Sequence, residues 1–160
     1  MTPDERIQEL GLILPEPIQL PPNLEMKFSW LRVSGNRVFI SGHIALNADG
    51  SVSEITGKVG GEVTIEQGYE AARLTGLAIL SSLKREFGTL NNITAWLRAF
   101  GMVNVAPGFV KAPPVINGFS DLIIDVFGPE IGNHSRSAVG MAELPFGAPV
   151  EIEAEVEISL

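Results

Sequence analysis

The sequence predicts an α+β fold in which one mixed β-sheet is covered by two helices. Apolar residues recur at steps of three and four in two long segments, 64–88 and 113–129, and at steps of two in the last segment, 150–160. The expected order is two strands, a helix, a strand, a helix and two strands, which is typical of helices packed on one sheet. With 160 residues and 45% hydrophobic content, we expect one domain, 1–160, around one core.

The N-terminus is predicted to form a short helix and then an extended arm. Thr2 can cap a helix over 2–10, with Pro3 at the first helical position and Glu5 completing a capping box. The Pro-rich residues that follow predict extended backbone, so residues 1–26 are expected to lie on the surface as an arm.

Two β-rich runs, 27–34 and 37–42, predict a hairpin. Gly35 and Asn36 separate the runs, and Gly followed by Asn suits a tight two-residue turn. Trp30 falls inside the first run, where packing in the core is the usual role of such a residue.

The segment 64–88 gives the strongest helix prediction. Thr64 and Gln67 form a capping box, and Gly88 is placed to end the helix. We expect Gly76 to permit a close approach to the sheet. The apolar stripe of this helix consists of Ile65, Tyr69, Ala72, Gly76, Leu80, Leu83 and Phe87.

The second half of the chain is predicted to hold a strand over 92–105 and a helix over 113–129. Gly128 and Pro129 are expected to stop that helix. Trp96 lies in the strand, where it is expected to pack in the core.

Two final strands, 135–144 and 150–160, are expected to form a hairpin around the turn 145–149. Apolar residues and glutamates alternate along the last strand, so one face is expected to be buried and the other to meet water or a partner. The glutamates are Glu151, Glu153, Glu155 and Glu157.

The composition argues against several classes of function. With 11 Lys and Arg against 19 Asp and Glu, the net charge of −8 disfavours broad binding to nucleic-acid phosphates. The absence of cysteine excludes disulfides, thiol nucleophiles and thiolate metal sites. His43 and His134 stand without metal-ligand spacing, so we expect no metal site. No apolar run approaches the roughly 20 residues that span a bilayer, and no signal-peptide pattern is seen, so a cytoplasmic location without membrane contact is expected.

One arginine stands out near the start of a predicted strand. Between residues 112 and 160, Arg136 is the only Lys or Arg among eight Asp and Glu residues. Two interpretations are open. The guanidinium could form a structural ion pair, or it could bind an anionic ligand, since it can offer two parallel N–H donors to a carboxylate.

Three stretches of the sequence together resemble the RidA (YjgF) family of reactive-intermediate deaminases. They are "RVFISGHIAL", the capped helix, and the terminal "RSAVGMAELPFGAPVEIEAEVEI". The resemblance covers the chain from about Phe28 onward. It implies a chorismate-mutase-like fold, a homotrimer with ligand pockets between neighbouring subunits, and hydrolysis of imines or enamines to 2-keto acids and ammonia. It implies no metal and no organic cofactor.

The same resemblance assigns roles to individual residues. Arg136 matches the arginine that binds the substrate carboxylate, and Glu151 matches the acid that positions or activates the attacking water. We expect the turn 145–149 to bring these two strand regions near each other. The other matching positions are Ser41 and Gly42 in the pocket wall, Asn117 on the second helix, and the backbone at Ser137 and Ala138.

Three departures from the family pattern bear on activity. Phe28 stands where active members commonly have tyrosine, and Ala138 stands where many have cysteine. The segment 104–117 looks longer than usual and could reshape the cleft.

The resemblance therefore predicts a hydrolytic deaminase of small imines or enamines that carry a carboxylate. The alternative is a trimer that binds small carboxylate metabolites without turnover, an interpretation that Phe28 and Ala138 motivate. A ribonuclease activity is disfavoured by the net charge of −8 and the absence of a basic stripe.

Overall fold

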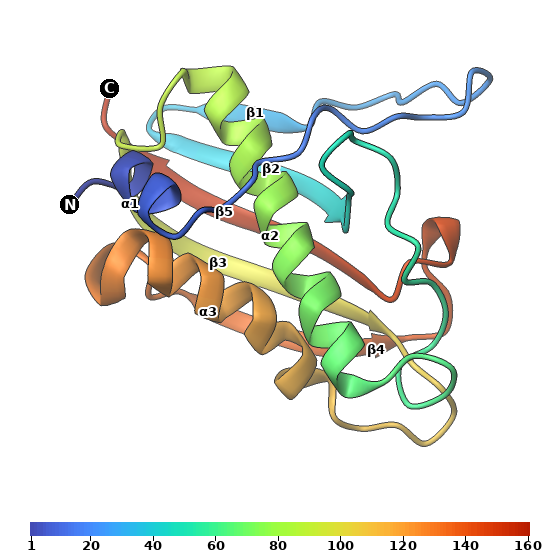
Figure 1. Cartoon of the computed structure of the whole chain (residues 1–160). Coiled ribbons are helices and arrows are strands. Elements are labelled where there is room, and N and C mark those ends of the chain that lie inside the picture. Colours follow the sequence, from blue (N-terminus) through green and yellow to red (C-terminus); the bar gives the residue numbers. More distant parts are fainter.

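The computed structural model describes residues 1–160 as a five-stranded sheet with two long helices on one face (Figure 1). The elements are α1 (Pro3–Glu9), β1 (Leu31–Ser34), β2 (Arg37–Ile44), α2 (Ile65–Phe87), β3 (Ile93–Asn104), α3 (Ala112–Ile131), β4 (Ser135–Met141), a 3₁₀ turn (Pro145–Gly147) and β5 (Val150–Ile158). The sheet order is β1-β2-β5-β3-β4, with β3 and β4 parallel and the other neighbours antiparallel. The predicted fold, a mixed sheet under two helices, is confirmed.

The ends of both long helices follow local sequence signals. The Gln67 side chain accepts a hydrogen bond from the Thr64 N–H at 2.9 Å, and the Thr64 hydroxyl accepts one from the Gln67 N–H at 3.1 Å, so the predicted capping box forms. Gly88 ends α2 in a left-handed conformation with φ of 74°, which glycine adopts without a Cβ penalty. Gly128 (φ 77°) and Pro129 break the regular part of α3 as predicted, and a short turn follows. None of the helices combines the length and hydropathy that would let it cross a membrane.

Strand β1 is shorter than the predicted run 27–34. Only the last four residues of that run pair with β2. The β2–β5 ladder is irregular between Ile40 and His43 and resumes at His43, which pairs with Ile152. Trp30 lies just before β1, where its carbonyl accepts the Ser41 N–H at 2.9 Å. Its predicted place in a strand is wrong.

The expected hairpin of the last two strands is also wrong, because β3 lies between β4 and β5. The connection from β4 to β5 passes the end of β3, where Asn104 donates its backbone N–H to the Pro149 carbonyl at 2.9 Å. The Asn104 side chain donates to the Ala148 carbonyl at 3.3 Å. The backbone N–H and C=O groups on both edges of a strand need hydrogen-bond partners. This order supplies them for β3 by pairing it with β4 on one side and β5 on the other.

Glycines allow α2 and α3 to pack closely. A Cβ on Gly118 of α3 would lie 2.0 Å from the Tyr69 carbonyl oxygen of α2. A Cβ on Gly76 of α2 would lie 2.7 Å from Leu122 Cδ2 of α3. Gly76 therefore serves the contact with α3, and its expected approach to the sheet is corrected.

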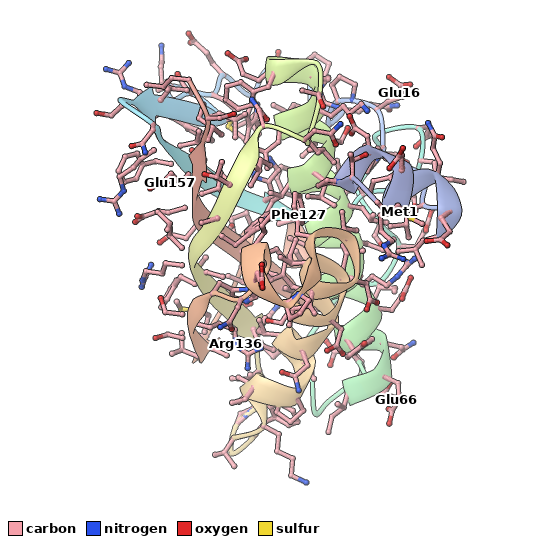
Figure 2. All side chains as sticks on the ribbon, turned by 90° about the vertical axis from the view of Figure 1, so that its left-hand side faces the viewer. Met1, Glu16, Glu66, Phe127, Arg136 and Glu157 are labelled. Atoms are coloured by element: carbon pink, nitrogen blue, oxygen red, sulfur yellow. The ribbon has the colours of Figure 1, made fainter.

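The two faces of the sheet differ in character. Under the helices, Trp96 is 2% exposed and packs edge-on against Phe119 and Phe127, so its predicted core role is confirmed. The glutamates of β5 alternate with buried residues and point away from the helices, as Glu157 does in Figure 2.

The N-terminal residues cover the outer surface of α2 (Figure 1). The capping box of Thr2 and Glu5 forms as predicted, and Ile7 of α1 is buried. Beyond α1, the chain crosses α2, where the Ser81 hydroxyl donates to the Pro15 carbonyl at 2.5 Å. Helix α2 is consequently buried on its outer side as well as toward the sheet.

Replacing Gly118 with alanine should destabilise the fold. In an unstrained helix, exchanging glycine for alanine favours folding by about 1 kcal/mol, but here the new methyl group meets the Tyr69 backbone at 2.0 Å. We expect the free energy of unfolding in urea to fall by roughly 1–3 kcal/mol, the usual cost of overpacking. A variant as stable as the parent would show that the helices do not approach this closely.

Candidate functional site

The structure divides the predicted site residues into two groups. Phe28, Gly42 and Glu151 line one pocket, and Ser41 precedes Gly42 in β2. Arg136 and Asn117 are hydrogen-bonded to each other at the β4 edge of the sheet, where Ser137 and Ala138 follow in the same strand.

Arg136 projects from β4 toward α3 (Figure 2). Its Nη1 atom donates to Asn117 Oδ1 at 2.9 Å and to Ser120 Oγ at 3.0 Å, and its Nη2 atom donates to the Pro113 carbonyl at 3.4 Å. Helix α3 begins at Ala112, so the connection expected at 104–117 is limited to residues 105–111. The early start of α3 provides all three acceptors of Arg136.

The charge of Arg136 has no counter-ion within the chain. All six ion pairs join other residues, so the structural ion pair is not formed within one chain. Burial lowers the pKa of Arg136 below its ordinary value, and Asp121 opposes this shift, but a guanidinium remains charged at neutral pH. Three of its five N–H donors are used, which leaves the Nε donor and one Nη2 donor without an acceptor in the chain. Two such neighbouring donors suit a carboxylate.

A serine and a histidine that the sequence analysis did not single out support Arg136. Ser120 Oγ also lies 2.9 Å from His134 Nε2, and His134 Nδ1 lies 2.7 Å from the Gly132 carbonyl oxygen. A carbonyl can only accept, so Nδ1 carries the proton and Nε2 accepts the serine O–H. Burial lowers the pKa of His134, which favours this neutral form. The serine oxygen is thereby oriented to accept from Arg136.

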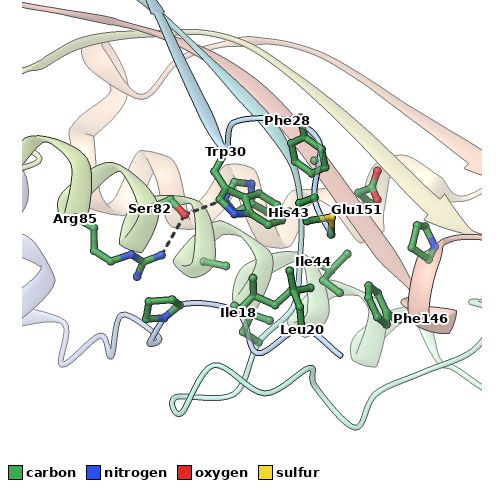
Figure 3. A pocket seen from close by; sticks show the side chains of 16 residues that line it. Ile18, Leu20, Phe28, Trp30, His43, Ile44, Ser82, Arg85, Phe146 and Glu151 are labelled. Atoms are coloured by element: carbon green, nitrogen blue, oxygen red, sulfur yellow. Dashed lines mark hydrogen bonds between the residues drawn. The ribbon is translucent and has the colours of Figure 1, made fainter. Parts of the chain in front are cut away.

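The pocket of the first group is a cavity of about 550 Å³ (Figure 3). It lies just before the start of β1, where β2 becomes an open edge, between α2, β5, the turn at Pro145 and the N-terminal segment. Its walls are largely apolar, with Phe28 itself 50% exposed. Most of this lining is not apparent in the sequence, because it comes from segments that only folding brings together.

His43 lies in the wall of this pocket in an arrangement like that of His134. Its Nδ1 donates to the Ser41 carbonyl at 2.6 Å, and its Nε2 accepts from Ser82 Oγ at 2.9 Å. Burial, the largest influence, and nearby Arg85 lower the pKa of His43 to about 4. Both ring nitrogens of each histidine are engaged, so neither ring offers a free nitrogen to a metal.

Gly42 makes room for the carboxylate of Glu151. A Cβ at Gly42 would lie 2.8 Å from Glu151 Oε2. Burial raises the pKa of Glu151, and the like charge of Glu153 adds to the shift. Glu151 is thus a half-buried carboxyl group with a raised proton affinity at the wall of the pocket.

Within one chain, Arg136 and Glu151 point to opposite faces of the sheet. Ala99 of β3 pairs with both Arg136 and Ala154, so these three side chains share the face that the helices cover. Glu151 lies three residues from Ala154 in the same regular ladder, and side chains alternate, so it belongs to the other face. The expectation that the turn 145–149 brings the two residues together is wrong for a single chain.

Comparisons with known proteins find relatives along the whole chain. The profile of the family described as YjgF/chorismate mutase-like matches residues 4–150. Protein TCP17 of Trypanosoma cruzi is 37% identical over 153 residues, which make up 96% of this chain and 92% of that protein.

Solved structures with the same fold include relatives of differing identity. A protein of unknown function from Agrobacterium tumefaciens is 38% identical with a TM-score of 0.86, over 99% of this chain and 93% of that one. A candidate endoribonuclease from Shewanella oneidensis is 28% identical with a TM-score of 0.88, over 99% and 100% of the two chains. TdcF of E. coli, solved with bound serine, is 20% identical with a TM-score of 0.57, over 90% and 99%, and shares the fold.

Neutral His43 should make stability depend on pH. The folded pKa of about 4 lies below the ordinary 6.5, so the unfolded chain takes up the proton first as pH falls. The stabilisation is present above pH 6.5 and is lost toward pH 4. Between pH 7 and 4.5, the free energy of unfolding measured in urea should fall by about 2–3 kcal/mol more in the parent than in His43→Gln. Parallel pH profiles of the two proteins would contradict a buried neutral histidine.

Proposed function

Because the chain belongs to the YjgF (RidA) family, with its chorismate-mutase-like fold, we propose that it hydrolyses small imines or enamines that carry a carboxylate. The products are a 2-keto acid and ammonia. The observation that supports this most directly is Arg136, a cation with only neutral partners and two free N–H donors. Those donors suit a substrate carboxylate, and the partly buried setting strengthens the pairing.

Glu151 is the proposed acid–base group. It takes a proton from water as the oxygen attacks the imine carbon and passes that proton to the imine nitrogen, which gives a neutral tetrahedral carbinolamine. It then takes the hydroxyl proton of the carbinolamine and delivers it to the amine nitrogen, so that ammonia leaves as the C=O bond forms. The raised pKa of Glu151 suits a carboxyl group that must both accept and release a proton near neutral pH. Backbone groups at Ser137 and Ala138 are proposed to position the imine.

The proposed site requires two copies of the chain. Arg136 and Glu151 lie on opposite faces of one sheet, so one ligand meets both only if a neighbouring copy supplies the second residue. The family resemblance suggests a homotrimer, and a closed ring would cover the exposed edge strand β4. TdcF of E. coli, which shares the fold, was solved with serine, itself a small carboxylate.

Two positions favour binding without turnover as the second candidate function. Phe28 presents a ring without a hydroxyl at the pocket, and the Ala138 side chain packs against the core. A carboxylate-binding protein would still need Arg136 but would release no ammonia. Cleavage of RNA is less well supported, because the net charge of −8 opposes binding to a phosphate backbone.

The rate at which imines decay, with and without the protein, tests this proposal. Imino acids generated with an amino-acid oxidase should disappear faster in the presence of the protein, with ammonia released. Arg136→Gln should lower the rate on the order of 100-fold, because the substrate loses its anchor. Arg6→Gln, which removes an arginine from α1 that pairs with Glu9, serves as the matched control and should leave the rate unchanged.

Two results would contradict the proposal. One is an unchanged rate in Arg136→Gln. The other is no acceleration with any imine of a panel that spans small, branched and aromatic side chains. In that second case, calorimetric binding of 2-keto acids that Arg136→Gln weakens would identify the binding function instead.

A further inference from the structure

A second arginine without a counter-ion lines the pocket of Glu151. Arg85 of α2 donates through Nη1 to the Pro15 carbonyl and to Ser81 Oγ, and through Nη2 to Ser82 Oγ. None of the six ion pairs of the chain includes it. In Figure 3, Arg85 and Glu151 stand at opposite ends of the lining side chains.

The surroundings of Arg85 repeat those of Arg136. In each case the guanidinium donates to a helix serine that is also bonded to a histidine Nε2. Each histidine donates its Nδ1 proton to the carbonyl two residues earlier in the chain. Three of five N–H donors of Arg85 are used, which leaves the Nε donor and one Nη2 donor free, as in Arg136.

Apolar side chains fill the wall between the two ends of the pocket. They are Ile18, Leu20, Met26, Trp30, Ile44 and Leu46. The volume of about 550 Å³ lies within the range of sites for small organic molecules. An apolar wall with one free cation at its end matches a ligand that has an apolar body and one anionic group.

We propose that this pocket binds an amphipathic monocarboxylate, with the carboxylate on Arg85 and the apolar body along Trp30 and Ile44. A carboxylate matches two adjacent free N–H donors. A doubly charged phosphate head is disfavoured by Glu151 in the same pocket and by the net charge of −8. The residues named for this site come from one chain, and the pocket shares Glu151 with the proposed deaminase site.

Octanoate is a suitable probe, with octanol as the uncharged molecule of the same chain length. Binding to the whole protein is followed by calorimetry and by tryptophan fluorescence. Trp30 lines the pocket, whereas Trp96, the other tryptophan, is 2% exposed and supplies a constant background. We expect saturable binding of octanoate that changes Trp30 emission, and weaker binding of octanol.

Arg85→Gln should weaken octanoate binding roughly tenfold or more, because a charge-assisted pairing is lost, and should leave octanol binding unchanged. Arg73→Gln, on the same helix and paired with Glu70, is the matched control and should bind as the parent does. If Arg85→Gln unfolds, Arg85→Lys retains the charge without the planar donors and should bind with intermediate affinity.

Three outcomes would overturn the proposal. They are no saturable octanoate binding, equal affinity in Arg85→Gln and the parent, or loss of binding in Arg136→Gln with retention in Arg85→Gln. The last result would place the carboxylate at the other arginine. Since these measurements report binding alone, they stand whether or not the protein hydrolyses imines.

Discussion

Strand β3 separates β4 from β5, so the strand of Arg136 and the strand of Glu151 share no hydrogen-bonded edge. This order places Arg136 on an edge strand against α3 and Glu151 near the pocket at the opposite edge. It also directs the two side chains to opposite faces. A mechanism that uses both residues must therefore join two copies of the chain, and this constraint governs the proposed function.

The protein holds two arginines in the same way, with neutral acceptors in place of carboxylates. A partly buried cation without a counter-ion lowers the stability of the fold unless its N–H donors find acceptors. Here serine and carbonyl oxygens accept hydrogen bonds from some of those donors. A nearby histidine kept neutral orients each serine without adding positive charge. The remaining donors at Arg85 and Arg136 make both positions suited to anions.

Features set by local sequence were predictable. The capping boxes at Thr2 and Thr64, the helix end at Gly88 and the break at Gly128 depend on residues within a few positions of each other. The sheet order and the helix contact at Gly76 depend on distant segments, and both differed from expectation.

The site was predictable only in part, because many of its contacts join segments that are distant in the sequence. Arg136 stood out by its charge in an acidic stretch, whereas nothing local distinguished Glu151 from the other glutamates of its strand. Ser120 and His134 lie close to Arg136 in sequence, but their roles follow from the packing of α3 on β4. No sequence pattern marked Arg85 as a binding residue, because its pocket is assembled from five separate segments.

Mixing two inactive variants tests the shared site most directly. Oligomers of Arg136→Gln chains and oligomers of Glu151→Gln chains each lack one residue at every site. When equal amounts are co-assembled at random, about one quarter of the sites combine an intact arginine from one chain with an intact glutamate from its neighbour. Recovery of about one quarter of the parent imine-hydrolysis rate is therefore predicted. No recovery in verified mixed oligomers would contradict the account, because both residues would then act from the same chain.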